Sequence, residues 1–122
     1  MYKYLIILLL ASTQAHADVT GDDLYKSCLS DAVFIDGYIA GLRDKSIADY
    51  VYVDESTPQA DKSRPHVKLM LRLINDHCIE GETRRQVDAL VCRYLSSNPN
   101  KRSEYANDLV ERVLKDAFPC KR

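Results

Sequence analysis

The chain lacks most of the features that mark common enzymes, membrane proteins and nucleic-acid-binding proteins. Its 122 residues contain no Cys-x-x-Cys pair and no Gly-x-Ser-x-Gly motif, so we expect neither a zinc site nor a hydrolase nucleophile. The formal net charge of −1 gives no electrostatic reason to expect nucleic acid or anionic lipid as a partner. No apolar run approaches the roughly 20 residues that cross a bilayer. Repeats and low-complexity runs are also missing, which indicates a single globular domain.

The N-terminus has the three parts of a signal peptide. Lys3 is followed by an apolar run over residues 4–11 and by the small-x-small sequence Ala15-His16-Ala17. We therefore predict a cleavable signal peptide over residues 1–17, cut after Ala17, and a single helical domain over residues 18–122. Cleavage removes Lys3 and changes the net charge from −1 to −2. The alternative is an uncleaved N-terminal helix that packs on the domain.

Four cysteines lie in the predicted mature chain, and their even number indicates disulfides in an exported protein of this size. Their spacing does not fit zinc, since His77 directly precedes a cysteine and cannot easily share a tetrahedral ion with it. Four cysteines allow three pairings, and their spacing does not choose among them. The disulfide candidates are Cys28, Cys78, Cys92 and Cys120.

Apolar residues recur at three- and four-residue steps in four stretches, which predicts four helices. Thr83 with Gln86 three residues later forms a capping-box pattern at one start, and Pro65 suits the first turn of another. We expect an all-α fold, a small bundle of four helices or slightly more with one long loop, stabilised by disulfides. The predicted helices run from about Thr20 to Leu42, from after Ser63 to Ile74, from Thr83 to the stop at Asn98-Pro99-Asn100, and from about Ser103 to Phe118.

Gly37 and Gly41 lie four residues apart inside the first predicted helix. Each glycine costs about 1 kcal/mol in a helix interior, so the pair indicates close backbone packing by a neighbour. We expect that neighbour to be another helix of the same chain, while contact with a second copy in a homodimer is the alternative.

The segment from Lys45 to Lys62 is long for a connection in a compact domain, and long loops tend to be functional or disordered. Its centre alternates polar and apolar residues, which predicts a partly extended, acidic loop that carries two tyrosines. Such a loop could enter a cleft with a basic rim, because tyrosine is frequent at binding hot spots. The alternative is a loop that packs its own rings against Met70 or Leu73. The candidate partner-binding residues are Asp49, Tyr50, Tyr52, Asp54 and Glu55.

Candidate catalytic groups are few. Only His66 and His77 remain after cleavage, and neither accompanies a recognisable nucleophile. The adjacent acidic pairs Asp22-Asp23 and Asp54-Glu55 do not form acid–base couples, because sequence neighbours on a helix do not face each other. We expect no catalytic residue, no cofactor and no metal.

Two ordered sets of residues follow a known family pattern. The first is Leu24-x-x-x-Cys28 with Gly37-Tyr38-Ile39-Ala40-Gly41-x-x-Asp44. The second is Cys78-Ile79-Glu80-Gly81-Glu82-Thr83, Gln86-Val87, Tyr94-Leu95, Asn98-Pro99, Ala106, Leu109-Val110 and Phe118-Pro119-Cys120. Together they resemble the Rap/Tai family of periplasmic immunity proteins, which neutralise peptidoglycan amidase toxins delivered by type VI secretion. The chain departs from the family where Ile35-Asp36 replaces a cysteine and Cys92 appears instead, so the pairing is not carried over.

The resemblance implies an all-helical, often dimeric periplasmic protein that binds its amidase effector, occludes the catalytic cleft and catalyses nothing itself. The loop over residues 49–55 is the expected inserting element, and the turn from Ser96 to Arg102 is its competitor. A small helical periplasmic chaperone or stress protein is the alternative function, since it would share the size, the export signal and the cysteines.

Overall fold

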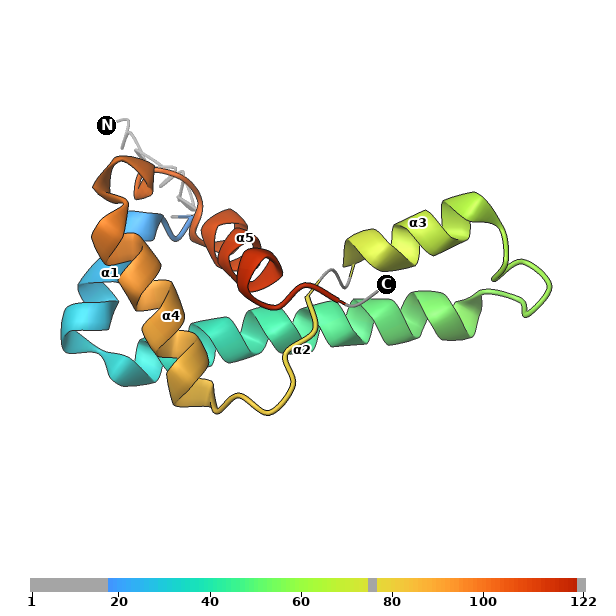
Figure 1. Cartoon of the computed structure of the whole chain (residues 1–122), viewed down its shortest axis with the longest axis horizontal. Coiled ribbons are helices and arrows are strands. Elements are labelled where there is room, and N and C mark those ends of the chain that lie inside the picture. The colour runs from blue at the N-terminus through green and yellow to red at the C-terminus, as the bar shows by residue number, and fades with distance from the viewer. Residues whose placement is uncertain (1–17, 75–76, 121–122) are drawn as a thin grey trace, which may run out of the picture.

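The computed structural model describes residues 18–74 and 77–120, and these ranges are all-helical, which confirms the predicted fold class (Figure 1). The predicted signal peptide over residues 1–17 lies outside the described residues. The elements in the described ranges are α1 (Gly21–Ser30), α2 (Ala32–Ser56), α3 (Pro65–Ile74), α4 (Arg84–Ser97), the short 3-10 helix η1 (Pro99–Lys101) and α5 (Ala106–Ala117).

The hydrophobic core lies at one end of the molecule, where α1, α4 and α5 pack around the first half of α2 (Figure 1). We call this part, with residues 32–44 of α2, the body. Its buried side chains come from all four helices, so removing any one helix would expose the others. They are Leu24, Ile35, Ile39, Val87, Val91, Leu95, Ala106, Leu109, Val110, Val113 and Leu114.

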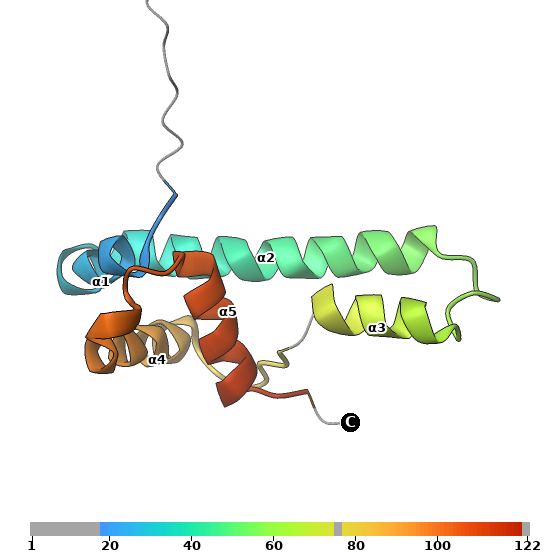
Figure 2. The same ribbon diagram turned by 90° about the horizontal axis from the view of Figure 1, so that it is seen from above.

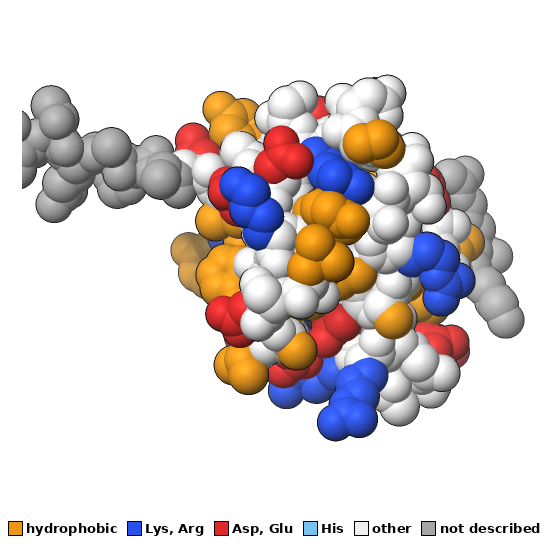
Figure 3. All heavy atoms as spheres, turned by 90° about the vertical axis from the view of Figure 1, so that its left-hand side faces the viewer, with side chains coloured by type: hydrophobic (Ala, Val, Ile, Leu, Met, Phe, Trp, Pro, Cys, Tyr) orange, Lys and Arg blue, Asp and Glu red, His pale blue; other side chains and the backbone are white. Residues whose placement is uncertain are grey.

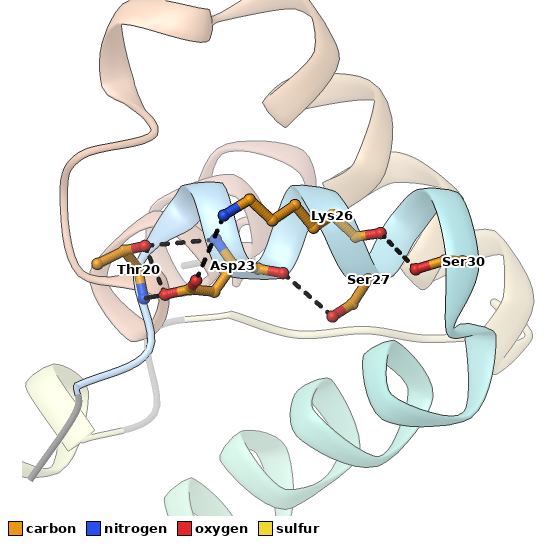
Figure 4. Close-up of polar contacts among 5 residues, drawn as sticks. All are labelled: Thr20, Asp23, Lys26, Ser27 and Ser30. Atoms are coloured by element: carbon orange, nitrogen blue, oxygen red, sulfur yellow. Dashed lines mark hydrogen bonds and ion pairs between the residues drawn. The ribbon is translucent and has the colours of Figure 1, made fainter.

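Helix α1 begins with a complete capping box (Figure 4). The Thr20 hydroxyl accepts a hydrogen bond from the Asp23 backbone N–H at 3.3 Å, and the Asp23 carboxylate accepts one from the Thr20 N–H at 3.1 Å. The backbone N–H groups of Thr20 and Asp23, which have no acceptor within the helix, each gain a hydrogen-bond acceptor in this way. Farther along, the Ser27 and Ser30 hydroxyls donate to carbonyl oxygens four residues earlier.

The start of α1 also packs directly against the segment that precedes α5. The Gly21 N–H donates to the Glu104 carbonyl at 2.9 Å, and the Ala106 N–H donates to the Val19 carbonyl at 2.9 Å. Gly21 is buried here, and a Cβ atom at this position would lie 2.8 Å from both Cα and O of Arg102. Only glycine therefore fits this crossing without displacing backbone.

The first predicted helix is divided in two, which the prediction of one helix from Thr20 to Leu42 missed. Helix α1 ends at Ser30 and α2 begins at Ala32, with Asp31 between them. The Asp31 carboxylate accepts a hydrogen bond from the Phe34 N–H at 2.9 Å and caps the new helix. This cap lets the chain change direction, so that α1 packs against α2.

The prediction of an extended loop at residues 49–55 is wrong, because α2 continues as a helix to Ser56. No glycine or proline interrupts the chain between Leu42 and Pro58, and an ion pair joins Lys45 to Asp49 one helical turn later. Strand preference depends strongly on context, and here packing against α3 favours the helix. The true connection covers only residues 57–64.

All four cysteines form disulfides, as predicted, and the structure supplies the pairing that the sequence left open. Cys28 of α1 is bonded to Cys92 of α4 inside the body. Cys78 is bonded to Cys120, which fastens the C-terminal segment to the segment before α4. A backbone hydrogen bond from the Cys78 N–H to the Phe118 carbonyl, 2.7 Å long, supports the second disulfide.

One long face of α2 carries no other helix of the described residues, since α3, α4 and α5 all lie on the opposite side of it (Figure 2). Gly37 and Gly41 are exposed and by helical spacing lie on this bare face, and a Cβ atom at either position would meet nothing within 4 Å beyond the nearby backbone of α2 itself. The interpretation that these glycines admit another helix of the same chain is therefore wrong. We call this surface the outer face of α2.

Candidate functional site

The second half of α2 and the antiparallel helix α3 form a two-helix arm that projects from the body (Figures 1 and 2). We define the arm as residues 45–74. An ion pair of 2.9 Å between Lys62 and Asp54 joins the connection to α2, and the Thr57 hydroxyl donates to the Val53 carbonyl at 2.6 Å. These contacts hold the tip of the arm in one conformation.

The arm exposes most of its apolar side chains. Val67 of α3 is its one buried apolar residue, whereas Tyr52 is 73% exposed. Exposed apolar groups gathered on a projection are typical of a binding surface rather than of a monomer's ordinary surface. The exposed large apolar residues of the arm are Ile47, Tyr50, Val51, Tyr52, Leu69, Met70 and Leu73.

The body offers a more ordinary surface. At its end away from the arm, acidic and basic side chains are interspersed with apolar ones (Figure 3). A hollow of about 400 Å³ lies between α4 and α5, lined by residues that include Leu90, Arg93, Tyr94 and Val113. It is wide open, so it fits a contact surface better than an enclosed ligand site.

The five predicted partner-binding residues all lie on the last two turns of α2, but they do not share one face. The Asp49 and Asp54 carboxylates are engaged by lysines of the same chain, Lys45 and Lys62. Tyr50 is only about one-third exposed, while Tyr52 is largely exposed. Glu55 is exposed and has no ion-pair partner within residues 18–74 and 77–120.

The comparison with known proteins covers the arm together with the body. A family model described as Rap1a immunity proteins matches residues 20–120, a span that contains the five α-helices and both disulfides. The chain belongs to this family. The resemblance seen in the sequence is thus confirmed, and an immunity protein acts by binding a toxin. No curated protein and no solved structure showed significant similarity.

The turn from Ser96 to Arg102 in this immunity protein is braced from within the body. The Arg102 guanidinium donates to the Leu95 carbonyl at 2.7 Å and the Ser96 carbonyl at 3.2 Å. It also lies over the Tyr25 ring, 3.5 Å from the ring centre, in a cation–π contact. This contact could not be predicted from the sequence, because Tyr25 and Arg102 are far apart in the chain.

Groups for covalent or metal chemistry are scarce in this immunity protein. The four cysteines are all in disulfides, so no thiol nucleophile is available. His66 is exposed at the start of α3, and His77 is buried beside the bridge to Pro119. Over residues 18–74 and 77–120, no three His, Cys, Asp or Glu side chains are grouped as metal ligands. No helix in these ranges has the length and apolar character to cross a membrane.

A charged cluster joins α2 to α4 on the body of the immunity protein. Arg84 Nε lies 3.1 Å from Asp36 Oδ1, and Arg43 and Asp88 line the same hollow. Burial, and next the neighbouring Asp36 carboxylate, raise the pKa of Asp88 above its usual value, while Arg84 opposes the shift. The hollow measures only about 10 Å³, which is room for one water at most. The cluster is therefore a helix contact and not a substrate site.

Replacing Asp88 with asparagine is expected to raise the melting temperature at pH 7 and to leave it unchanged near pH 3. Folding raises the pKa of Asp88, so its ionised form costs stability above that pKa, and the cost vanishes below the ordinary value of 3.8, where the carboxyl is protonated in both states. Circular dichroism melts at the two pH values measure this. Asp44→Asn on the exposed side of α2 is the control. A loss of stability at pH 7 would contradict the expectation.

Proposed function

We propose that this immunity protein acts in the periplasm, where it binds a peptidoglycan amidase delivered by type VI secretion and covers the amidase active site. The predicted signal peptide supports export, and the two disulfides suit an oxidising compartment. The observation that carries the proposal is the projecting arm, most of whose apolar side chains are exposed.

Inhibition by steric exclusion requires a rigid body and an element that projects from it. The body meets the first need with a packed core and the Cys28–Cys92 disulfide. The arm meets the second, and because α2 runs through both parts, it holds the arm in a fixed direction. A preformed arm also lowers the ordering cost of binding. Neither step requires chemistry by the immunity protein itself.

Of the residues predicted to bind the partner, Tyr52 and Glu55 are the best placed. Both are exposed near the tip of the arm, and Tyr52 can bury a large ring while its hydroxyl stays polar. We assign Asp49, Tyr50 and Asp54 a supporting part, since the two carboxylates hold the lysines that stabilise the arm.

We also propose that the chain forms a homodimer through the outer face of α2. This face combines the two glycines with Val33, Ile47 and Val51, which are exposed and follow the same side of the helix. A second copy would cover these apolar groups, and the glycines would let the two backbones approach closely. A mass of one chain by light scattering at micromolar concentration would contradict the dimer.

The test of the proposed function mixes the oxidised mature chain, residues 18–122, with the amidase encoded beside its gene. We expect peptidoglycan hydrolysis to stop at an equimolar ratio, because a tight complex blocks the catalytic groove. Full amidase activity in the presence of excess chain would refute the proposal. If the chain instead prevented aggregation of unrelated unfolded proteins and left the amidase active, the chaperone alternative would replace it.

A further inference from the structure

Helix α3 has an apolar face that points away from the rest of the arm. Val67 is buried against α2, with 6% of its surface exposed, and Leu71 and Ile74 on the same side are half-buried. Leu69 and Leu73 lie four residues apart on the other side and are 55% and 66% exposed. By helical spacing these two leucines form a continuous ridge. We call this surface the outer face of α3.

The charge that α3 itself places beside this ridge is basic. Helix α3 contains no aspartate or glutamate, and Lys68 and Arg72 are both exposed. Neither cation has an ion-pair partner among the residues that the structure describes. The outer face of α3 therefore presents an apolar ridge next to two uncompensated positive charges.

Three of the four acidic residues of the arm do not balance these charges, because lysines and an arginine of the arm already engage them. Asp61 accepts from Arg64 Nε at 2.8 Å, and Asp49 and Asp54 are paired as described above. Judged from the sequence, the arm offers negative charge to a partner. In the folded arm, the positive charge on α3 is left free beside the ridge, while the one acidic residue of the arm outside an ion pair, Glu55, lies on α2.

A hollow lies next to the ridge and shares Leu69 with it. It measures about 270 Å³, and its lining includes Pro65, Lys68, Leu69 and Arg72. A partner side chain that enters it meets apolar carbon at Leu69 and Pro65, together with the two cations Lys68 and Arg72. A carboxylate next to an apolar group matches this lining in both polarity and charge.

We infer that the outer face of α3 is a toxin-binding surface, and that the toxin surface that covers it is apolar at its centre and acidic at its rim. The inference rests on the proposed function for the identity of the toxin. It adds that the toxin surface must carry negative charge, and that α3 is the helix that contacts this surface. Exposed charge pairs mainly raise the association rate and select the partner, while burial of the leucines supplies affinity.

The experiment measures binding of the neighbouring amidase to immobilised mature chain by surface plasmon resonance. Lys68→Glu with Arg72→Glu should weaken binding about tenfold or more, slow association and reduce the dependence on salt. Leu69→Ser with Leu73→Ser should weaken binding about tenfold, mainly through faster dissociation. Both pairs are exposed, so circular dichroism should show an unchanged fold.

Arg85→Glu with Arg93→Glu is the matched control, because it makes the same change of charge on exposed arginines of α4. Its affinity should stay within about twofold of the original chain. If the control weakens binding and the α3 variants do not, the toxin binds α4 and the inference is wrong.

The outcomes separate this inference from the proposed function. If the amidase binds the unaltered chain and both α3 variants equally well, only the inference about α3 is refuted, and the proposed function stands. An amidase that does not bind the unaltered chain refutes the proposed function and this inference with it. If the charge-reversed variant binds the amidase normally but no longer sediments with phosphatidylglycerol vesicles, the basic face binds anionic membranes, and the inference is overturned.

Discussion

Replacing Gly21 with alanine is expected to lower the free energy of unfolding by about 3 kcal/mol, in line with overpacking of a tight site. The added Cβ would lie 2.5 Å from Leu109 Cδ1 and 2.8 Å from Cα and O of Arg102. The leucine can rotate, but the Arg102 backbone cannot move away easily, because the Asp22 N–H donates to its carbonyl at 2.8 Å. The substitution must therefore push α1 away from the segment before α5. Urea unfolding followed by circular dichroism measures the loss.

Gly37→Ala is the matched control, and its effect should have the opposite sign. A Cβ atom at Gly37 meets nothing within 4 Å, so alanine should stabilise the helix by about 0.5–1 kcal/mol. The comparison is made at concentrations where light scattering gives a single chain, so that a dimer contact does not enter. Equal effects at the two positions would show that α1 does not cross the chain as closely as described.

Replacing Cys28 and Cys92 together with alanine is expected to cost about 4 kcal/mol. The disulfide closes a loop of 64 residues. Its loss raises the conformational entropy of the unfolded chain, and this increase grows slowly with loop length. Both cysteines also pack against the core, so part of the loss comes from missing contacts. Removing both partners avoids a free thiol that could pair wrongly. Urea unfolding without reductant measures the change.

The other disulfide provides the comparison. Cys78 and Cys120 close a shorter loop of 42 residues, and Cys78 is exposed, so the double variant Cys78→Ala with Cys120→Ala should lose no more stability than the first. A reductant should lower the midpoint of the unaltered chain further than that of either double variant. A midpoint that does not respond to reductant would mean that neither disulfide contributes.

The features that the sequence predicts correctly are those set by local chemistry. The Thr83–Gln86 capping box forms as expected, with hydrogen bonds of 3.3 Å and 2.7 Å. Pro65 opens α3, and Asn98-Pro99 follows the end of α4. Each signal involves residues within one turn of each other, so the rest of the fold need not be known.

The wrong predictions concern segments whose secondary structure depends on packing against residues that are far away in the sequence. The spacing of apolar residues continues through Asp31, so the boundary between α1 and α2 was hidden in a periodic stretch. The alternation in residues 49–55 favours a strand locally, but in the fold this segment packs against α3 as a helix. A preference of less than 1 kcal/mol per residue is easily overcome by such packing.

The surroundings of the predicted partner-binding residues could be predicted only in part, for the same reason. Tyr52 and Glu55 are exposed on the arm as a binding role requires. The pairing of Asp54 with Lys62 could not be predicted, because it depends on the chain folding back after Ser56. The outer face of α3 was not singled out, since Leu69 and Leu73 look like ordinary core residues of an amphipathic helix until α2 is seen to pack on the other side.

The separation of core and arm has a consequence for how this protein can change. With Val67 as the one buried apolar residue of the arm, substitutions at its other positions remove little packing and cost little stability. The body, whose core leucines and valines are buried, tolerates far less at those positions. With the arm as the proposed toxin-binding element, recognition can be altered residue by residue there without endangering folding, and new specificities can arise on an unchanged scaffold.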